Sequence, residues 1–81
     1  MPRMQFFREL FELRGLIEPA AAALAAERGT PEDVAIIAEA YAAMVPPGLS
    51  SEEEVQADMR FHRAILAACH NDLLAQMGAS S

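Results

Sequence analysis

The chain has 81 residues, a length that suits one small domain or part of one. Its 12 acidic and 6 basic residues give a formal net charge of −6. This charge argues against direct nucleic-acid contact, because proteins bind the phosphate backbone through clustered Lys and Arg. The single cysteine excludes an internal disulfide and favours a reducing, cytoplasmic setting. No apolar run is long enough to cross a membrane.

The composition favours helices that pack closely through small side chains. Hydrophobic residues make up 53% of the chain, whereas aromatic residues make up only 6% and Trp is absent. We therefore predict an all-α fold, an antiparallel bundle of three to four helices. So much apolar character on so short a chain also indicates that some apolar surface meets a partner.

The first helix is expected over about residues 4–28. Pro19 lies inside it and should kink or split it, since proline lacks a backbone donor. Arg14 and Glu18 fall on the apolar side of this helix, one turn apart. They form either a salt bridge at the edge of the core or, in the functional interpretation, a guanidinium that grips a ligand carboxylate through two hydrogen bonds.

The second helix has a clear start. Gly29 ends the first helix, and residues 30–33 (Thr-Pro-Glu-Asp) supply an N-cap, a proline for the first turn and acids that complement the helix dipole. Residues 45–50 contain two prolines and a glycine, so they are expected to form a loop.

The third helix, predicted over most of residues 51–72 and ended by Asn71 and Asp72, carries the sharpest chemical signal. Ser51 and Glu54 match a capping box. Asp58 and His62 lie in the middle of its apolar side, one turn apart, where a lone carboxylate would be costly to bury. The two groups could share a proton, a metal ion or a ligand, or they could be a hydrogen-bonded pair inside a helical core.

Other polar groups near this pair have structural interpretations. Cys69 follows His62 by seven residues, about 10 Å along the helix axis, too far to ligate the same metal, so it is expected in the core. Asn71 can cap a short final helix.

The order of the motifs resembles that of a known family. The matching segments are residues 10–14 (LFELR), 17–19 (IEP), 30–33 (TPED), 58–65 (DMRFHRAI) and 71–74 (NDLL). Together they resemble the ligand-sensing FCD domain of GntR-type bacterial transcriptional regulators, a class named for the C-terminal domain of the fatty-acid regulator FadR.

This resemblance implies a helical bundle that binds a small metabolite, often a carboxylate, and in many members a divalent metal held by one Asp and three His. Asp58 and His62 match the first Asp and the first His of that metal set. Arg14 matches an arginine that lies beside the effector pocket in several members. Such regulators act as dimers and bind DNA through a winged-helix domain that precedes the sensing domain.

The sequence departs from the family pattern at both ends. It carries neither the winged-helix domain nor the later helices with the other two metal histidines, so we expect the front half of a sensing domain. A half bundle should be completed by self-association, as a homodimer or higher homo-oligomer. Its metal site, for Zn²⁺, Ni²⁺ or Mn²⁺, would be incomplete in one chain.

The leading hypothesis is therefore an effector- and metal-sensing, dimerising fragment of a transcriptional regulator. The alternative is a helical dimerisation or adaptor module without a ligand, in which the inward polar pairs only specify packing. An enzyme is not expected, because no nucleophile or oxyanion donor is placed near His62.

Overall fold

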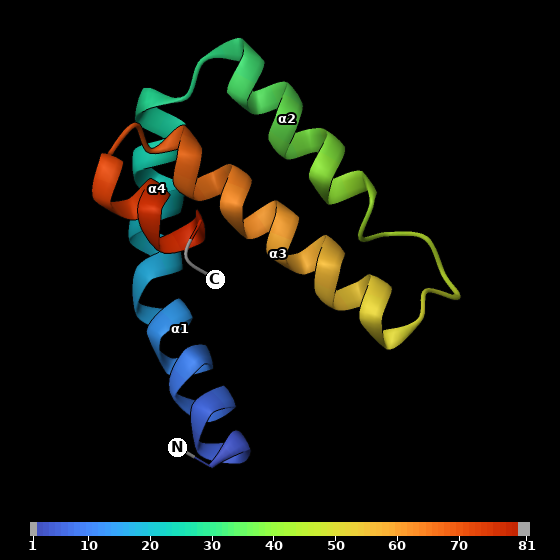
Figure 1. Ribbon diagram of the computed structural model, residues 1–81. Coiled ribbons are helices and arrows are strands. Elements are labelled where there is room, and N and C mark those ends of the chain that lie inside the picture. Colours follow the sequence, from blue (N-terminus) through green and yellow to red (C-terminus); the bar gives the residue numbers. More distant parts are fainter. Residues whose placement is uncertain (1, 80–81) are drawn as a thin grey trace.

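The computed structural model describes residues 2–79 and contains four helices. They are α1 (Arg3–Arg28), α2 (Pro31–Ala42), α3 (Ser51–Ala68) and α4 (Asp72–Ala79), and no strand occurs among the described residues. The central helix is α3, which packs against each of the other three, whereas α1 and α2 do not pack on each other within residues 2–79 (Figure 1). The predicted all-α fold is confirmed.

The first helix is continuous through its proline. α1 runs from Arg3 to Arg28, so Pro19 does not split it in two. Pro19 still removes the backbone donor that would bind the carbonyl of Gly15 one turn earlier. At the end of α1, Arg28 donates a hydrogen bond of 3.2 Å to the Cys69 carbonyl, which ties the end of this helix to the end of α3.

The α2 N-terminus has the predicted cap. The Thr30 hydroxyl accepts a hydrogen bond from the Asp33 backbone N–H at 3.1 Å, and the Asp33 carboxylate accepts one from the Thr30 N–H at 2.9 Å. Pro31 occupies the first turn. This reciprocal pairing satisfies two of the helix's free donors and fixes where α2 begins.

The α3 capping box lies one residue earlier than predicted. Ser50, not Ser51, is the N-cap, and its partner is Glu53, not Glu54, with distances of 3.1 and 2.9 Å. Both serines are followed three residues later by a glutamate, so the sequence pattern fits either one. The structure selects Ser50 because its backbone is extended, as an N-cap requires, while Ser51 is already helical.

The third helix ends at Ala68, shortly before Asn71 and Asp72, which were predicted to mark its end. His70 adopts a left-handed conformation with φ of 51°, which turns the chain toward α4. Asn71 then caps α4 as predicted, its side-chain oxygen accepting hydrogen bonds from the N–H groups of Leu73 and Leu74 at 3.0 and 3.1 Å.

The core is small and lies where α1, α3 and α4 meet. Ala21, Leu66 and Cys69 are its buried members, and the predicted core position of Cys69 is confirmed. Partly buried apolar side chains surround them: Ile17, Leu24, Ala25, Ile65 and Leu74. Small residues at the centre let the helix backbones approach closely.

Several large apolar residues of α1 and α3 are exposed and do not reach the core. Phe7 and Phe11 on α1 are 40% and 64% exposed, and Val55 on α3 is 56% exposed. All three lie toward the amino-terminal ends of their helices, away from the core. Figure 1 shows the first turns of α1 projecting from the rest of the molecule.

The molecule is more open than a compact monomer of its size. Its radius of gyration is 13.2 Å, against about 12 Å for a compact chain of this length. Its accessible surface is 5905 Å², against about 4,800 Å² for a compact monomer of this mass. The helices thus form a partial bundle. Among residues 2–79, no helix combines the length and the apolar character that crossing a bilayer would need.

Candidate ligand-binding groove

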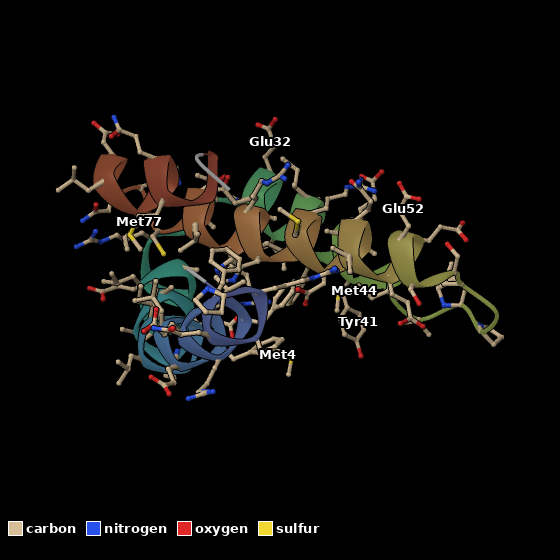
Figure 2. All side chains as sticks on the ribbon, turned by 60° about the horizontal axis from the view of Figure 1, so that its bottom comes forward. Met4, Glu32, Tyr41, Met44, Glu52 and Met77 are labelled. Atoms are coloured by element: carbon tan, nitrogen blue, oxygen red, sulfur yellow. The ribbon has the colours of Figure 1, made fainter. Side chains whose placement is uncertain are left out.

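An open groove lies between α1 and α3 and is bounded at one end by α4. Its volume of about 860 Å³ is within the range of small-molecule sites. Met77 closes the α4 end, and Figure 2 places it between α4 and α1. The groove wall is mainly apolar and consists of Phe6, Phe7, Leu10, Phe11, Leu13, Ile17, Val55, Met59, Leu66 and Met77.

Two polar residues of α1 face this groove. Arg14 and Glu18 lie one turn apart, and an Arg14 Nη2 hydrogen bond to Glu18 Oε1 joins them at 3.2 Å. The intrahelical salt bridge is therefore present. Gly15 also lines the groove, and a β-carbon at this position would have open space around it.

Arg14 also reaches across to α3. Its Nη1 donates to Asp58 Oδ2 at 2.8 Å, and its Nη2 donates to Asp58 Oδ1 at 3.2 Å. This is the two-bond geometry that a guanidinium makes with a planar carboxylate. The hydrogen bonds to Asp58 raise the pKa of Arg14 above its ordinary value, so the guanidinium is always charged.

His62 approaches the second acid of the group. Its Nδ1 lies 2.9 Å from Glu18 Oε1, but the two are not aligned as a hydrogen bond. That nitrogen is buried and has no hydrogen-bond partner among the described residues, and the same is true of Arg14 Nε. Two buried nitrogens of one cluster thus have no hydrogen-bond partner among the described residues, which is uncommon in a folded protein.

We call these four residues the polar quartet: Arg14 and Glu18 from α1, Asp58 and His62 from α3. The side chains of Arg14 and His62 are 20% and 17% exposed, and those of Asp58 and Glu18 are 39% and 42% exposed. The two α3 groups both line the groove. Asp58 is paired with Arg14 of α1, whereas His62 Nδ1 lies close to Glu18 of α1 without a hydrogen bond. With His62 neutral, the quartet carries a net charge of −1.

The described residues supply too few donors for the predicted metal site. Within residues 2–79, no three His, Cys, Asp or Glu side chains are grouped closely enough to hold a metal ion. A closed structural zinc site uses four ligands and a catalytic one uses three protein ligands. Asp58 and His62 are therefore two candidate ligands that would need further donors.

The sequence interpretation missed part of the groove. Glu54 and Arg63 line it, although only Glu54 could have been found by spacing, since it lies four residues before Asp58. Met59 and Met77 also contribute to the wall. Met77 comes from α4, and no local signal in the sequence relates that helix to the Arg14 region.

Comparisons with known proteins place the amino-acid sequence of the chain in a family. The model of the family described as "FCD domain" matches residues 9–80. The chain is 42% identical over 66 residues to the galactonate operon transcriptional repressor of Escherichia coli K12, covering 82% of this chain and 29% of that protein. It is 37% identical over 71 residues to the Glc operon transcriptional activator of the same strain, covering 82% and 28%.

The chain thus spans less than a third of the length of these relatives, both of which are named as transcriptional regulators. No solved structure matches it significantly. The family match covers most of the chain and includes every member of the polar quartet. The chain belongs to the FCD domain family of transcriptional regulators.

Proposed function

We propose that the groove is the effector site of a transcriptional regulator and that it takes a small carboxylate together with a divalent metal. The observation that carries this proposal is a cluster of four ionisable side chains set in an otherwise apolar groove. Ligand sites commonly combine apolar walls with a few convergent polar groups. The relatives, which are regulators of operons, support the regulatory setting.

Arg14 is the proposed contact for the ligand carboxylate. Its guanidinium is mostly buried and already holds a carboxylate in two-bond geometry, that of Asp58. A guanidinium in such surroundings recognises planar anions better than an exposed lysine does. One relative is named for a galactonate operon, so the sugar acid galactonate is a suitable first probe.

Asp58 and His62 are the proposed metal ligands, with Zn²⁺, Ni²⁺ and Mn²⁺ all compatible with one carboxylate and one imidazole. When bound, the metal would supply positive charge. The quartet with neutral His62 carries −1, so a divalent cation would give it +1 and favour a carboxylate. The remaining donors must come from outside the described residues, and a second copy of the chain is one source.

We also propose that the chain self-associates through the open side of the groove. The accessible surface exceeds the value for a compact monomer by about 1,100 Å². A standard interface removes about 800 Å² from each partner, so the excess is large enough for one. Phe6, Phe7 and Phe11 expose 50%, 40% and 64% of their surface at this side.

Zinc titration by calorimetry tests the metal proposal. We expect measurable heat with the wild-type chain and a large loss of affinity in His62→Ala. His70→Asn is the matched control, because His70 lies at the α3–α4 turn and outside the groove, and asparagine tolerates its left-handed backbone. Equal and negligible heats in the wild type and His62→Ala would contradict the metal proposal for this chain.

The second candidate is a helical adaptor without a ligand. Arg14 is already paired with Asp58 and Glu18, so the cluster could serve only to hold α1 against α3. The double substitution Asp58→Asn with His62→Gln separates the two functions. If zinc raises the melting temperature of the wild type but not of the double variant, the sensing proposal is supported. Equal melting temperatures with and without zinc favour the adaptor.

A further inference from the structure

We infer that Asp58 is an internal competitor for the carboxylate ligand of Arg14, so that the Arg14–Asp58 pair is a latch that a ligand must open. The inference rests on the proposed function, because it concerns the same groove. It adds an inhibitory role for Asp58 that does not depend on any metal.

The latch follows from how Arg14 uses its nitrogens. Both terminal nitrogens donate to the Asp58 carboxylate, at 2.8 and 3.2 Å, and Nη2 also donates to Glu18. A ligand carboxylate would accept hydrogen bonds from the same parallel pair of N–H groups. Asp58 and the ligand therefore cannot occupy that edge of the guanidinium together.

The exposure of the partners indicates which one leaves. The Asp58 side chain is 39% exposed, so water can solvate its carboxylate once it is released. The Arg14 side chain is only 20% exposed and keeps its bond to Glu18, which lies one turn away on the same helix. Arg14 thus stays in the groove while Asp58 is displaced.

Opening the latch would also affect the packing of the two helices. The core contacts between α1 and α3 involve Ala21, Leu66 and Cys69, whereas Arg14–Asp58 joins the same helices further toward their open ends. A ligand that binds only the open form stabilises that form by mass action. Carboxylate binding is therefore coupled to the loss of the ion pair between α1 and α3.

Carboxylate titrations in metal-free buffer, prepared over a chelating resin, test this inference. Galactonate and acetate are the probes, and NMR amide shifts report binding. Only molecules whose latch is open bind the carboxylate, so the apparent affinity falls as the closed fraction rises. Asp58→Asn weakens the closed form and should therefore bind roughly three- to tenfold more tightly than the wild type. Arg14→Gln should lose binding.

Removing any acid from the groove reduces repulsion of an anion, so a charge control is needed. Glu54→Gln removes one negative charge from the same groove, and Glu54 does not contact Arg14 among the described residues. We expect a smaller gain in affinity there, of less than about twofold, because only the reduced repulsion of the anion contributes. Circular dichroism of each variant verifies that the helices remain folded.

The outcomes separate this inference from the proposed function. Tighter binding by Asp58→Asn than by Glu54→Gln supports the latch. Binding by the wild type that is lost in Arg14→Gln but unchanged or weaker in folded Asp58→Asn overturns the latch and leaves the effector site standing. Absence of binding to the wild type and to Asp58→Asn overturns the latch, whereas the effector site is then decided by repeating the galactonate titration with zinc present.

Discussion

Cys69 is a fully buried side chain in the core between α1 and α3. Its Sγ donates a hydrogen bond to the Ala21 carbonyl at 3.1 Å and lies 3.3 Å from the Ile65 carbonyl. Burial raises the pKa of the Cys69 thiol, which leaves little thiolate near neutral pH. Since the thiolate is the reactive form, this cysteine has a packing role.

Reaction with a coloured disulfide reagent checks this assignment. We expect Cys69 to react slowly in the folded chain, at a rate limited by opening of the core, and at least tenfold faster in concentrated urea. The unfolded sample is the control for intrinsic reactivity. A native rate close to the unfolded rate would mean that the Ala21–Cys69 contact does not hold in solution.

The polar quartet illustrates what single-residue reasoning reaches and what it does not. The helical period alone placed Arg14 beside Glu18 and Asp58 one turn from His62, because residues four apart share a helix face. The pairing of Arg14 with Asp58 joins residues 44 positions apart. It depends on how α1 crosses α3, and no local pattern encodes that geometry.

At the scale of whole elements, the start of α3 was ambiguous for a definable reason. Ser50 with Glu53 and Ser51 with Glu54 are two overlapping copies of one capping pattern. The loop before the helix decides between them, since the N-cap must have an extended backbone. The helix itself was predictable, and only the residue that caps its start was not.

This ambiguity gives a clean pair of variants. Ser50→Ala should reduce the free energy of unfolding by roughly 0.5–2 kcal/mol, because the Glu53 N–H loses its acceptor. Ser51→Ala, one residue later and inside the helix, should change it by less than about 0.5 kcal/mol. Urea unfolding followed by circular dichroism measures both. A larger loss of stability in Ser51→Ala than in Ser50→Ala would mean that Ser51 is the N-cap, as first predicted.

The capping box at the start of α2 should make the stability of the fold depend on pH. The Thr30 backbone N–H, and then the 2.7 Å contact with His70, hold the pKa of Asp33 below its ordinary value. A carboxyl with a lowered folded-state pKa contributes stability above its unfolded pKa of about 3.9 and loses it as pH falls through the folded value. The Asp33 contribution is therefore complete at neutral pH and disappears in acid.

Unfolding measured at pH 7, 5 and 3 checks this sign. Asp33→Asn should be less stable than the wild type at the two higher pH values, and the difference should shrink at the lowest. Glu32→Gln is the control, because Glu32 is the neighbouring acid in the same turn and takes no part in the capping box. A stability difference for Asp33→Asn that is the same at all three pH values would contradict the linkage.

At the scale of the whole molecule, composition indicated helices and uncovered apolar surface, and both are present. The composition could not say which apolar residues are left uncovered. Phe11 of α1 and Val55 of α3 are large apolar residues, yet both are exposed, because these helices diverge away from their shared core (Figure 1). Periodicity identifies an apolar side but not whether another element covers it.

Sedimentation velocity tests whether a second copy covers this surface. We expect association that increases with concentration, weakened about tenfold or more by Phe11→Ser, which removes an aromatic anchor. Val34→Ser is the control, since Val34 is similarly exposed, at 58%, but lies on α2 away from the groove. A wild-type chain that stays monomeric across the accessible concentrations would contradict self-association.

The glycine one position after Arg14 has a practical consequence for protein engineering. Residue 15 lines the groove, and a β-carbon there would have no side chain or neighbouring element within 4 Å. At Gly29, by contrast, a β-carbon would lie 2.5 Å from the Ala25 carbonyl oxygen. The recognition properties of the chain can therefore be redesigned by building outward from residue 15, whereas the corner after α1 has to keep its glycine.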